Sequence, residues 1–278
     1  MIFYFSGTGN TRWIAQQLAK ATDEELLFIP DEMKKGVMRY ELMDGERLGF
    51  CFPTHGWQPP RIVREFIRKA QFVKTNTDCT DKTDVKTNTN DTNGTNFVWA
   101  VTTCGDNTGK TMDILNRELS KKGLKAETLF SVIMPESYVC LPFMYTDTES
   151  REREKIEQAR QQTEGIARII KERKRGIEQL NQGATPRLFS YVIGQYFNKH
   201  MITDKKFTVD IDICTRCGKC QRVCPVDNIT GTSPRWLHNG QCTCCLACYH
   251  YCPVHAINYG SITRKRDQYY FNTRGDRR

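Results

Sequence analysis

The feature that most constrains this chain is a cysteine pattern that occurs twice near its C-terminal end. Each run has the spacing C-x2-C-x2-C-x3-C-P. Three thiolates on a short loop reach three corners of one iron–sulfur cube, whereas the fourth lies beyond that reach. The repeat therefore predicts two cubane clusters held by Cys214, Cys217, Cys220, Cys224, Cys242, Cys245, Cys248 and Cys252.

The spacing is similar to that of bacterial two-cluster ferredoxins, in which the fourth cysteine of each run ligates the other cluster. This resemblance assigns cluster I to Cys214, Cys217, Cys220 and Cys252, and cluster II to Cys242, Cys245, Cys248 and Cys224. Ile229 and Ile257 follow the two runs at equal offsets and are expected to cover the clusters. The alternatives are less favoured, because structural zinc seldom needs two matched sets of four thiolates and disulfides belong to secreted chains.

A second constraining feature lies at the start of the chain. An apolar run from Ile2 to Phe5 leads into small and hydroxyl-bearing residues, and a helical apolar pattern starts at Trp13. This order predicts strand, loop and helix, with backbone N–H groups and the helix dipole directed at an anion. The loop has no lysine, so it is neither a Walker A loop nor a G-x-G-x-x-G turn. We predict a phosphate site formed by Ser6, Gly7, Thr8, Gly9, Asn10 and Thr11.

Further strands are expected at residues 25–29, 47–53, 97–101 and 128–134. In a doubly wound parallel sheet, ligands bind beyond the carboxyl ends of the strands, at the switch point of the strand order. Two loops begin at such ends and are predicted to contact a ring system: Thr54, His55, Gly56 and Trp57, and Thr102, Thr103, Cys104, Gly105 and Asp106. Trp57 is expected to stack on the ring, the alternative being a surface or core aromatic; for His55 the alternative is an ordinary loop residue.

With these loops, the chain resembles the flavodoxin–ferredoxin fusion proteins, sometimes called ferrodoxins, over nearly its full length. The loop Ser6 to Thr11 looks like the phosphate loop of the flavodoxins, which holds FMN. The resemblance implies FMN, two [4Fe–4S] clusters and an α/β fold. It implies a doubly wound, five-stranded parallel sheet in the order 2-1-3-4-5, followed by an α+β two-cluster ferredoxin domain. Cys244, beside the predicted ligand Cys245, departs from the family pattern.

Three regions are expected along the chain. Residues 1–180 would form the flavodoxin-like FMN-binding domain, 181–206 a packed linker, and 207–278 the two-cluster domain. Within the first, residues 74–96 contain a single aliphatic residue, Val85, and are expected to form a flexible surface insertion. Apolar residues recur in the linker at helical spacing, and a segment this apolar is not expected to be a free tether.

Three functions fit these features. The first is an electron-transfer protein that relays electrons between FMN and two [4Fe–4S] clusters and exchanges them with a redox protein partner. The second is a flavin-dependent reductase of a small substrate, with residues 135–145 bordering its pocket. The third is a flavin-free iron–sulfur module that binds or regulates a partner. No Ser/His/Asp constellation or carboxylate pair marks a separate chemical site, so no catalytic residue is assigned, and the choice between carrier and oxidoreductase stays open.

The formal net charge of +9 suggests a nucleic-acid partner only at first sight. Two clusters would contribute about −2 each and a flavin phosphate roughly −2, which leaves about +3 on the loaded protein and no reason to expect nucleic acid. No signal peptide or membrane-spanning segment is expected. Thirteen cysteines then favour a reducing, low-oxygen cytoplasm. The oligomeric state is not predicted.

Overall fold

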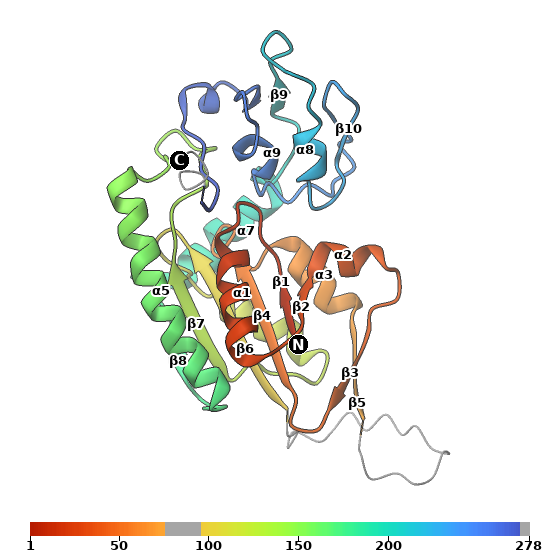
Figure 1. Cartoon of the computed structure of the whole chain (residues 1–278), viewed down its shortest axis with the longest axis vertical. Coiled ribbons are helices and arrows are strands. Elements are labelled where there is room, and N and C mark those ends of the chain that lie inside the picture. Colours follow the sequence, from red (N-terminus) through yellow and green to blue (C-terminus); the bar gives the residue numbers. More distant parts are fainter. Residues whose placement is uncertain (76–95, 273–278) are drawn as a thin grey trace.

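The structure, a computed structural model, describes residues 1–75 and 96–272. Figure 1 shows an α/β part built around a sheet and, above it, a part with short strands and helices that carries the cysteine runs. Most of the predicted insertion, residues 76–95, lies outside the described residues. Its first two residues, Lys74 and Thr75, belong to a strand instead.

The central sheet is parallel and, among the described residues, has six strands. Their order is β2 (Leu26–Phe28), β1 (Ile2–Tyr4), β4 (Arg47–Pro53), β6 (Phe97–Cys104), β7 (Thr128–Ile133) and β8 (Glu178–Gln179). The five expected strands lie side by side, but β8 extends the sheet beyond β7, so the predicted count and the complete order were wrong. β8 is two exposed polar residues long and carries no strand pattern in the sequence.

Helices cover both faces of this sheet. They are α1 (Asn10–Thr22), α2 (Ile29–Lys34), α3 (Arg61–Lys69), α4 (Thr111–Ser120) and α5 (Glu149–Lys171). Because successive strand residues point to opposite faces, Phe3 joins a core with residues of α3 and α4, whereas Ile2 joins a second core with residues of α1 and α5. α5 ends at Lys171, and the chain then turns back to form β8.

A small parallel pair lies beside the central sheet and was not predicted. It joins β3 (Arg39–Met43) to β5 (Gln71–Thr75). β5 begins two residues after α3 ends.

The linker is a run of helical turns that packs against the α/β part. It comprises α6 (Pro186–Leu188), η1 (Phe189–Ile193), α7 (Gly194–Tyr196) and η2 (Phe197–Met201). Ser190 is fully buried; its Oγ accepts a hydrogen bond from Lys110 N at 2.7 Å and its carbonyl accepts one from Gln58 Nε2 at 2.8 Å. Gly194 touches the carbonyl of Gly56 so closely that a Cβ would lie 2.3 Å from it. The linker is therefore docked on the loops that follow the strands.

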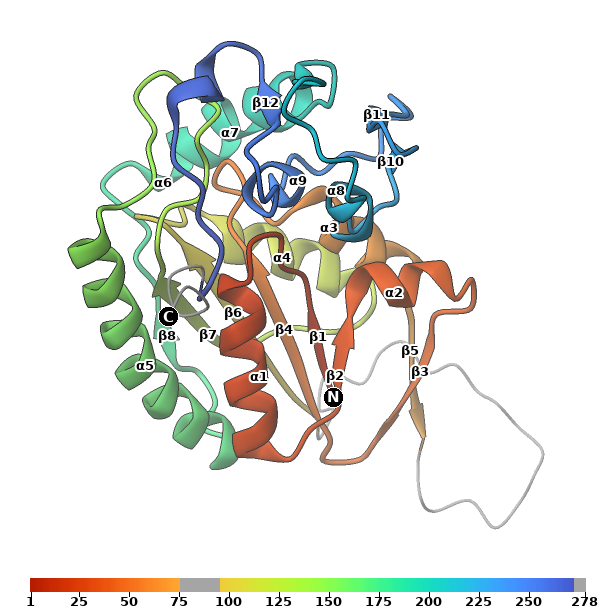
Figure 2. The same cartoon turned by 45° about the horizontal axis from the view of Figure 1, so that its top comes forward.

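The upper part contains two antiparallel strand pairs and three short helices among the described residues. These are β9 (Phe207–Val209) with β12 (Ile257–Tyr259), β10 (Ile229–Thr230) with β11 (Arg235–Trp236), and the helices α8 (Lys219–Arg222), α9 (Ala247–His250) and η3 (Ile262–Lys265). Figure 2 shows this part lying over the loop between β1 and α1. We refer to residues 207–272 as the iron–sulfur half.

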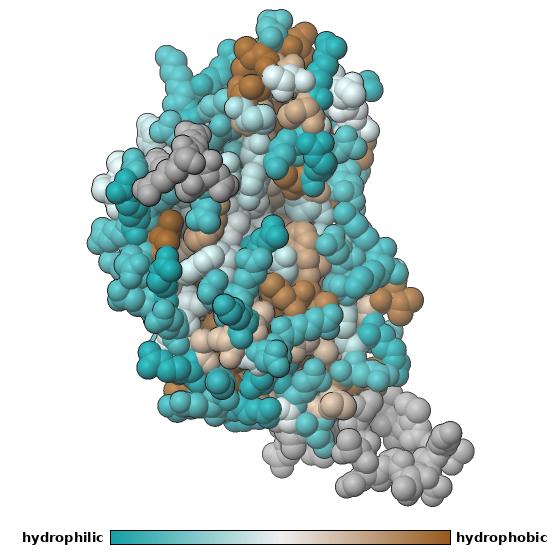
Figure 3. Space-filling view, in the orientation of Figure 1, coloured by the Kyte–Doolittle hydropathy of each residue, from teal (hydrophilic) through white to brown (hydrophobic). Residues whose placement is uncertain are grey.

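Most of the face shown in Figure 3 is hydrophilic, and hydrophobic residues gather at the top of the iron–sulfur half. No helix among the described residues has the length and apolar character needed to span a bilayer.

Candidate functional site

One large cavity lies at the carboxyl ends of the central strands. Its volume is about 570 Å³, within the range of small-molecule and cofactor sites. Four successive strand ends contribute to it, through the loops after β1, β4, β6 and β7. The topology that brings these ends together is the one expected to build a binding site.

Most of the predicted flavin residues line this cavity. They are Ser6, Gly7, Thr8, Asn10, Thr11, Thr54, His55, Gly56, Trp57, Thr103, Cys104, Gly105 and Asp106. Gly9 and Thr102 do not line the cavity, so their contact with a flavin stays a prediction. Gly9 faces Phe271 instead, and Thr102 is fully buried beneath the floor, where its hydroxyl lies 2.9 Å from that of Thr54.

The loop between β1 and α1 has the geometry of an anion site. Gly9 adopts a left-handed φ of 99°, and its N–H donates to Ser6 Oγ at 3.2 Å. The loop ends where the 13-residue helix α1 begins, so the positive end of the helix dipole faces the cavity. No lysine or arginine is among the described residues that line the cavity. A phosphate bound there would depend on backbone N–H groups and hydroxyls.

Two of the predicted phosphate donors already have protein partners. Asn10 Nδ2 donates to the carbonyl of Pro135 at 3.0 Å, and the Thr11 hydroxyl lies 2.8 Å from the Thr103 hydroxyl. These bonds tie the phosphate loop to the loops after β6 and β7. Asn10 and Thr11 thus hold the shape of the site, and their direct contact with phosphate stays a prediction.

The two loops predicted to contact a ring system, after β4 and β6, are held together by side chains that face each other. Trp57 Nε1 donates to Asn107 Oδ1 at 2.8 Å, and the indole packs on Phe189 of the linker at 4.7 Å between ring centroids. Burial lowers the pKa of His55 to about 4, so its ring is neutral at pH 7. Burial also raises the pKa of Cys104 to about 12, so this residue lines the cavity as a thiol.

A charged cluster that the sequence analysis missed supports the loop after β6. Lys155 Nζ donates to Asp147 Oδ2 at 2.7 Å and to the carbonyl of Gly105 at 3.1 Å. Asp147 Oδ2 also accepts the N–H of Glu136 at 2.7 Å. Glu136 lines the cavity, its Oε1 accepts two backbone N–H groups, and burial raises its pKa. No local sequence signal marks this cluster, because its members are brought together only by the fold.

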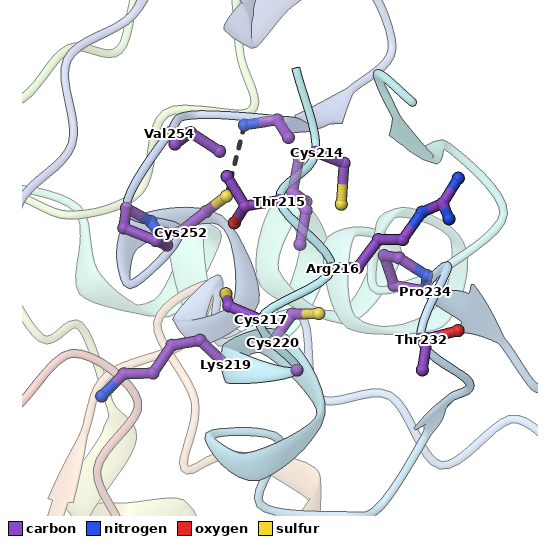
Figure 4. Close-up of a pocket in the computed structure, with 14 residues that line it drawn as sticks. Cys214, Thr215, Arg216, Cys217, Lys219, Cys220, Thr232, Pro234, Cys252 and Val254 are labelled. Carbon is purple, nitrogen blue, oxygen red and sulfur yellow. Dashed lines mark hydrogen bonds between the residues drawn. The ribbon is translucent and has the colours of Figure 1, made fainter. Parts of the chain in front are cut away.

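The cysteines of the two runs line two further spaces, which we call sites I and II. Site I has Cys214, Cys217, Cys220 and Cys252 around one space, and Figure 4 shows their side chains converging from the loop, α8 and the segment after α9. Site II has Cys224, Cys242, Cys245 and Cys248 around another. Ile257 lines site I and Ile229 lines site II, and both are buried.

The backbone of the two runs repeats as closely as the sequence does. Left-handed φ angles occur at Arg216 and Cys244, then at Gly218 and Leu246, so each pair occupies the same place in its run. Cys224 Sγ accepts the N–H of Asn228 at 3.3 Å, and Cys252 Sγ accepts that of Ala256 at 3.2 Å. Such N–H groups directed at sulfur stabilise a cluster's negative charge and tune its reduction potential.

Within the part of the chain that the structure describes, no three His, Cys, Asp or Glu side chains converge on the position of a single metal ion. In a cubane cluster each thiolate binds a different iron, so its ligands stand further apart. Each site has its four predicted ligand cysteines and one isoleucine in its lining, a donor set that fits such a cluster, and Cys244 also lines site II.

The loop of site II is also a wall of the large cavity. Thr243, Cys244, Cys245 and Leu246 line both. Gly7 of the phosphate loop packs so tightly on Cys245 that a Cβ at Gly7 would lie 2.7 Å from the Cys245 Cβ and 2.7 Å from its carbonyl oxygen. Cys244 is buried and hydrogen-bonded to Cys140 of the loop after β7. Among the residues that the structure describes, none lines both site I and the cavity, and Cys217 of site I is exposed.

Comparison with known proteins identifies one family. The model of the 4Fe-4S binding domain matches residues 207–230, which include the first cysteine run. The chain therefore carries an iron–sulfur domain of the kind that transfers electrons. None of the curated proteins matches the sequence.

Two solved structures show weak likeness. Rubredoxin oxygen:oxidoreductase from the anaerobe Desulfovibrio gigas has 14% identity and a TM-score of 0.31, over 62% of this chain and 36% of that protein. The Trp repressor binding protein from Bacillus subtilis has 12% identity and a TM-score of 0.30, over 57% of this chain and 95% of that protein. At these TM-scores neither likeness carries an argument about this chain.

Proposed function

We propose that this chain transfers electrons between FMN, bound in the large cavity, and two [4Fe–4S] clusters, bound at sites I and II. The observation that carries the proposal is the wall shared by the cavity and site II. A predicted cluster ligand, Cys245, touches the phosphate loop directly. Since electron transfer slows steeply with distance, this contact favours exchange within one chain.

The cavity fits the proposed flavin in its chemistry. Its phosphate end offers hydroxyls, backbone N–H groups and a helix N-terminus, and its ring end offers the loops of Thr54 and Thr103 beneath aromatic side chains. Trp57 and Tyr138 lie among those aromatics. FMN supplies two-electron chemistry and each cluster one-electron chemistry, so together they would connect the two kinds of carrier. The chain's own contribution is to hold the sites close and to shield the ring from water.

The order of the sites suggests where a redox partner docks. Site II lies against the cavity, whereas site I lies at the surface, with Cys217 exposed and Val254 at its rim 36% exposed. Ile211 and Ile213, just before the first run, are 65% and 48% exposed. We propose that a one-electron protein carrier binds this face and exchanges electrons with site I.

The test is made on full-length protein purified and reconstituted without oxygen. Iron, acid-labile sulfide and released flavin are measured for each chain. About eight irons and one FMN are expected if both sites and the cavity are filled. Eight irons without flavin, even after FMN is added, would refute the relay and favour the flavin-free binding module.

A second candidate, the flavin-dependent reductase, is favoured by the mouth of the cavity. Phe143 and Tyr196 line it and are 76% and 64% exposed, so the cavity reaches the surface through an apolar opening. Glu136 adds a carboxyl group that burial favours in its protonated form. Reoxidation of the reduced protein by a small acceptor, at a rate that depends on the acceptor's concentration, would favour this function over the relay.

A further inference from the structure

We infer that the C-terminal segment of the iron–sulfur half completes the phosphate end of the flavin site, with Tyr269 as a positioning residue. We call residues 266–272 the strap. Figure 2 shows it descending from the iron–sulfur half beside the start of α1. The inference rests on the proposed function, because it concerns the same cavity.

The strap holds the first residue of α1 in place. Tyr269 is 3% exposed, and its hydroxyl donates to Asn10 Oδ1 at 2.6 Å. The amide of Asn10 donates in turn to the carbonyl of Pro135 at 3.0 Å. Asn10 lines the cavity at the point where the helix dipole faces it. Its orientation is thus set from two sides, one of them the iron–sulfur half.

The strap also covers the outer side of the phosphate loop. The N–H of Phe271 donates to the carbonyl of Thr8 at 2.8 Å. The Phe271 ring stacks on Trp13 of α1, with centroids 5.1 Å apart and an interplanar angle of 23°. Gly9 has a left-handed φ, and a Cβ there would lie 2.9 Å from the Phe271 Cβ. The loop therefore has little freedom to move away from the cavity.

The other side of the strap is bound to α9, which carries the predicted ligand Cys248, and to the residues just after it. Tyr269 N donates to His250 Nδ1 at 3.0 Å, so the opposite ring nitrogen bears the proton and donates to the carbonyl of Ser137 at 2.7 Å. His250 belongs to α9, between two predicted ligands. Gln268 Nε2 donates to the carbonyl of one of these, Cys252, at 2.9 Å. The position of the strap is thus set by the iron–sulfur half.

This arrangement matters because no described residue that lines the proposed phosphate site is basic. Its affinity depends on backbone donors that already point in the right direction, and pre-ordering such a loop lowers the entropic cost of binding. A flavin without a phosphate gains nothing from this ordering. Tyr269 is therefore expected to favour FMN over riboflavin without touching either.

The experiment compares Tyr269→Phe with wild-type protein, both full-length and reconstituted with iron and sulfide. Each is titrated with FMN and with riboflavin, and the dissociation constants are read from flavin fluorescence. Loss of one buried hydrogen bond predicts a rise of about tenfold in the dissociation constant for FMN and none for riboflavin. Tyr191→Phe is the matched control, since it removes a hydroxyl from the linker, where the ring packs under Arg117.

A second variant, Trp13→Leu, removes the stack with Phe271 from the α1 side and leaves the iron–sulfur half unchanged. Trp13→Leu is expected to weaken the binding of FMN but not that of riboflavin, and it can be measured even if Tyr269→Phe fails to assemble. Unchanged FMN binding in both variants would overturn the inference, and so would an equal loss for both flavins. If the wild-type chain bound neither flavin, the proposed function itself would be refuted. If the wild-type chain bound FMN but the variants did not show the expected FMN-specific loss, only the role of the strap would be refuted.

Discussion

Replacing Gly7 with alanine is expected to force the phosphate loop away from site II. The new Cβ would lie 2.7 Å from both the Cβ and the carbonyl oxygen of Cys245, and backbone atoms cannot rotate out of the way as a flexible side chain can. The φ angle of Gly7 is not left-handed, so alanine can adopt this backbone conformation without strain. Any loss of stability in Gly7→Ala therefore reports on the contact with Cys245. Overpacking of this kind costs about 1–3 kcal/mol. For a chain of this size, each kcal/mol lowers Tm by about 2–4 °C.

The assay is thermal unfolding of the reconstituted protein, with FMN titration of the same samples. Gly165→Ala is the matched control, because a Cβ at Gly165 in α5 meets no atom within 4 Å. Alanine is the better helix former, so this control is expected to raise stability by up to about 1 kcal/mol. Gly7→Ala should lower both Tm and FMN affinity. A Gly7→Ala protein that matched the control in both measurements would refute the close contact between the two loops.

Four other substitutions test three separate parts of the structure. Cys220→Ser and Cys245→Ser should each remove the irons of one cluster, about four of eight by iron analysis. Only Cys245→Ser should weaken FMN binding, because the loop of Cys245 lines the cavity. Equal effects of the two variants on FMN binding would contradict this. Arg68→Ala should cost about 1 kcal/mol of unfolding free energy at pH 7. The Arg68 hydrogen bond is the largest of the interactions that lower the pKa of Glu118 from 4.5 to about 2, and Lys121 adds to it. The ion pair therefore stabilises the fold fully above pH 4.5 and loses its effect as the pH falls towards 2. Urea unfolding of both proteins across this range should show the difference shrinking, and a constant difference would refute the assignment. Ser190→Ala leaves the backbone N–H of Lys110 without its partner and should destabilise the docked linker by about 1–3 kcal/mol. The expected readout is faster proteolysis of the linker. An unchanged rate of cleavage would contradict the docking of the linker on the α/β part.

Much of the α/β part could be predicted because its signals are local. The apolar runs at Ile2 and Phe97 lie within buried strands, and the polar residues that follow them line the cavity. The cysteine spacing is local as well, and the four cysteines of each predicted set line one space in the structure. Thr102 was assigned to the cavity as the first loop residue after the apolar run 97–101, but β6 continues to Cys104, and Thr102 is a fully buried strand residue that does not line the cavity.

Other elements have no sequence signal of their own. β8 is two polar residues long and exists because β7 offers it an open edge. Likewise β3 pairs with β5 across an intervening helix and strand, and neither strand alternates strongly enough to be identified.

The site's long-range contacts could not be predicted from spacing. The linker was expected to pack on the domains, but nothing in it indicated that Phe197 and Ile202 would line the cavity. The same holds for Glu136 beside Gly105 and for Tyr269 bonded to Asn10, since each pair meets only after the chain has folded. Such contacts are set by topology, which local patterns do not encode.

The central claim is that flavin and clusters exchange electrons within one chain. The most direct test mixes oxidised, fully loaded protein rapidly with a one-electron protein donor and follows flavin and cluster absorbance, without oxygen, at several protein concentrations and saturating donor. Our account predicts that the clusters are reduced first and that flavin reduction follows at a rate independent of protein concentration. A flavin rate that rises in proportion to protein concentration, or flavin that stays oxidised while the clusters are reduced by a donor of lower potential than the flavin, would contradict it.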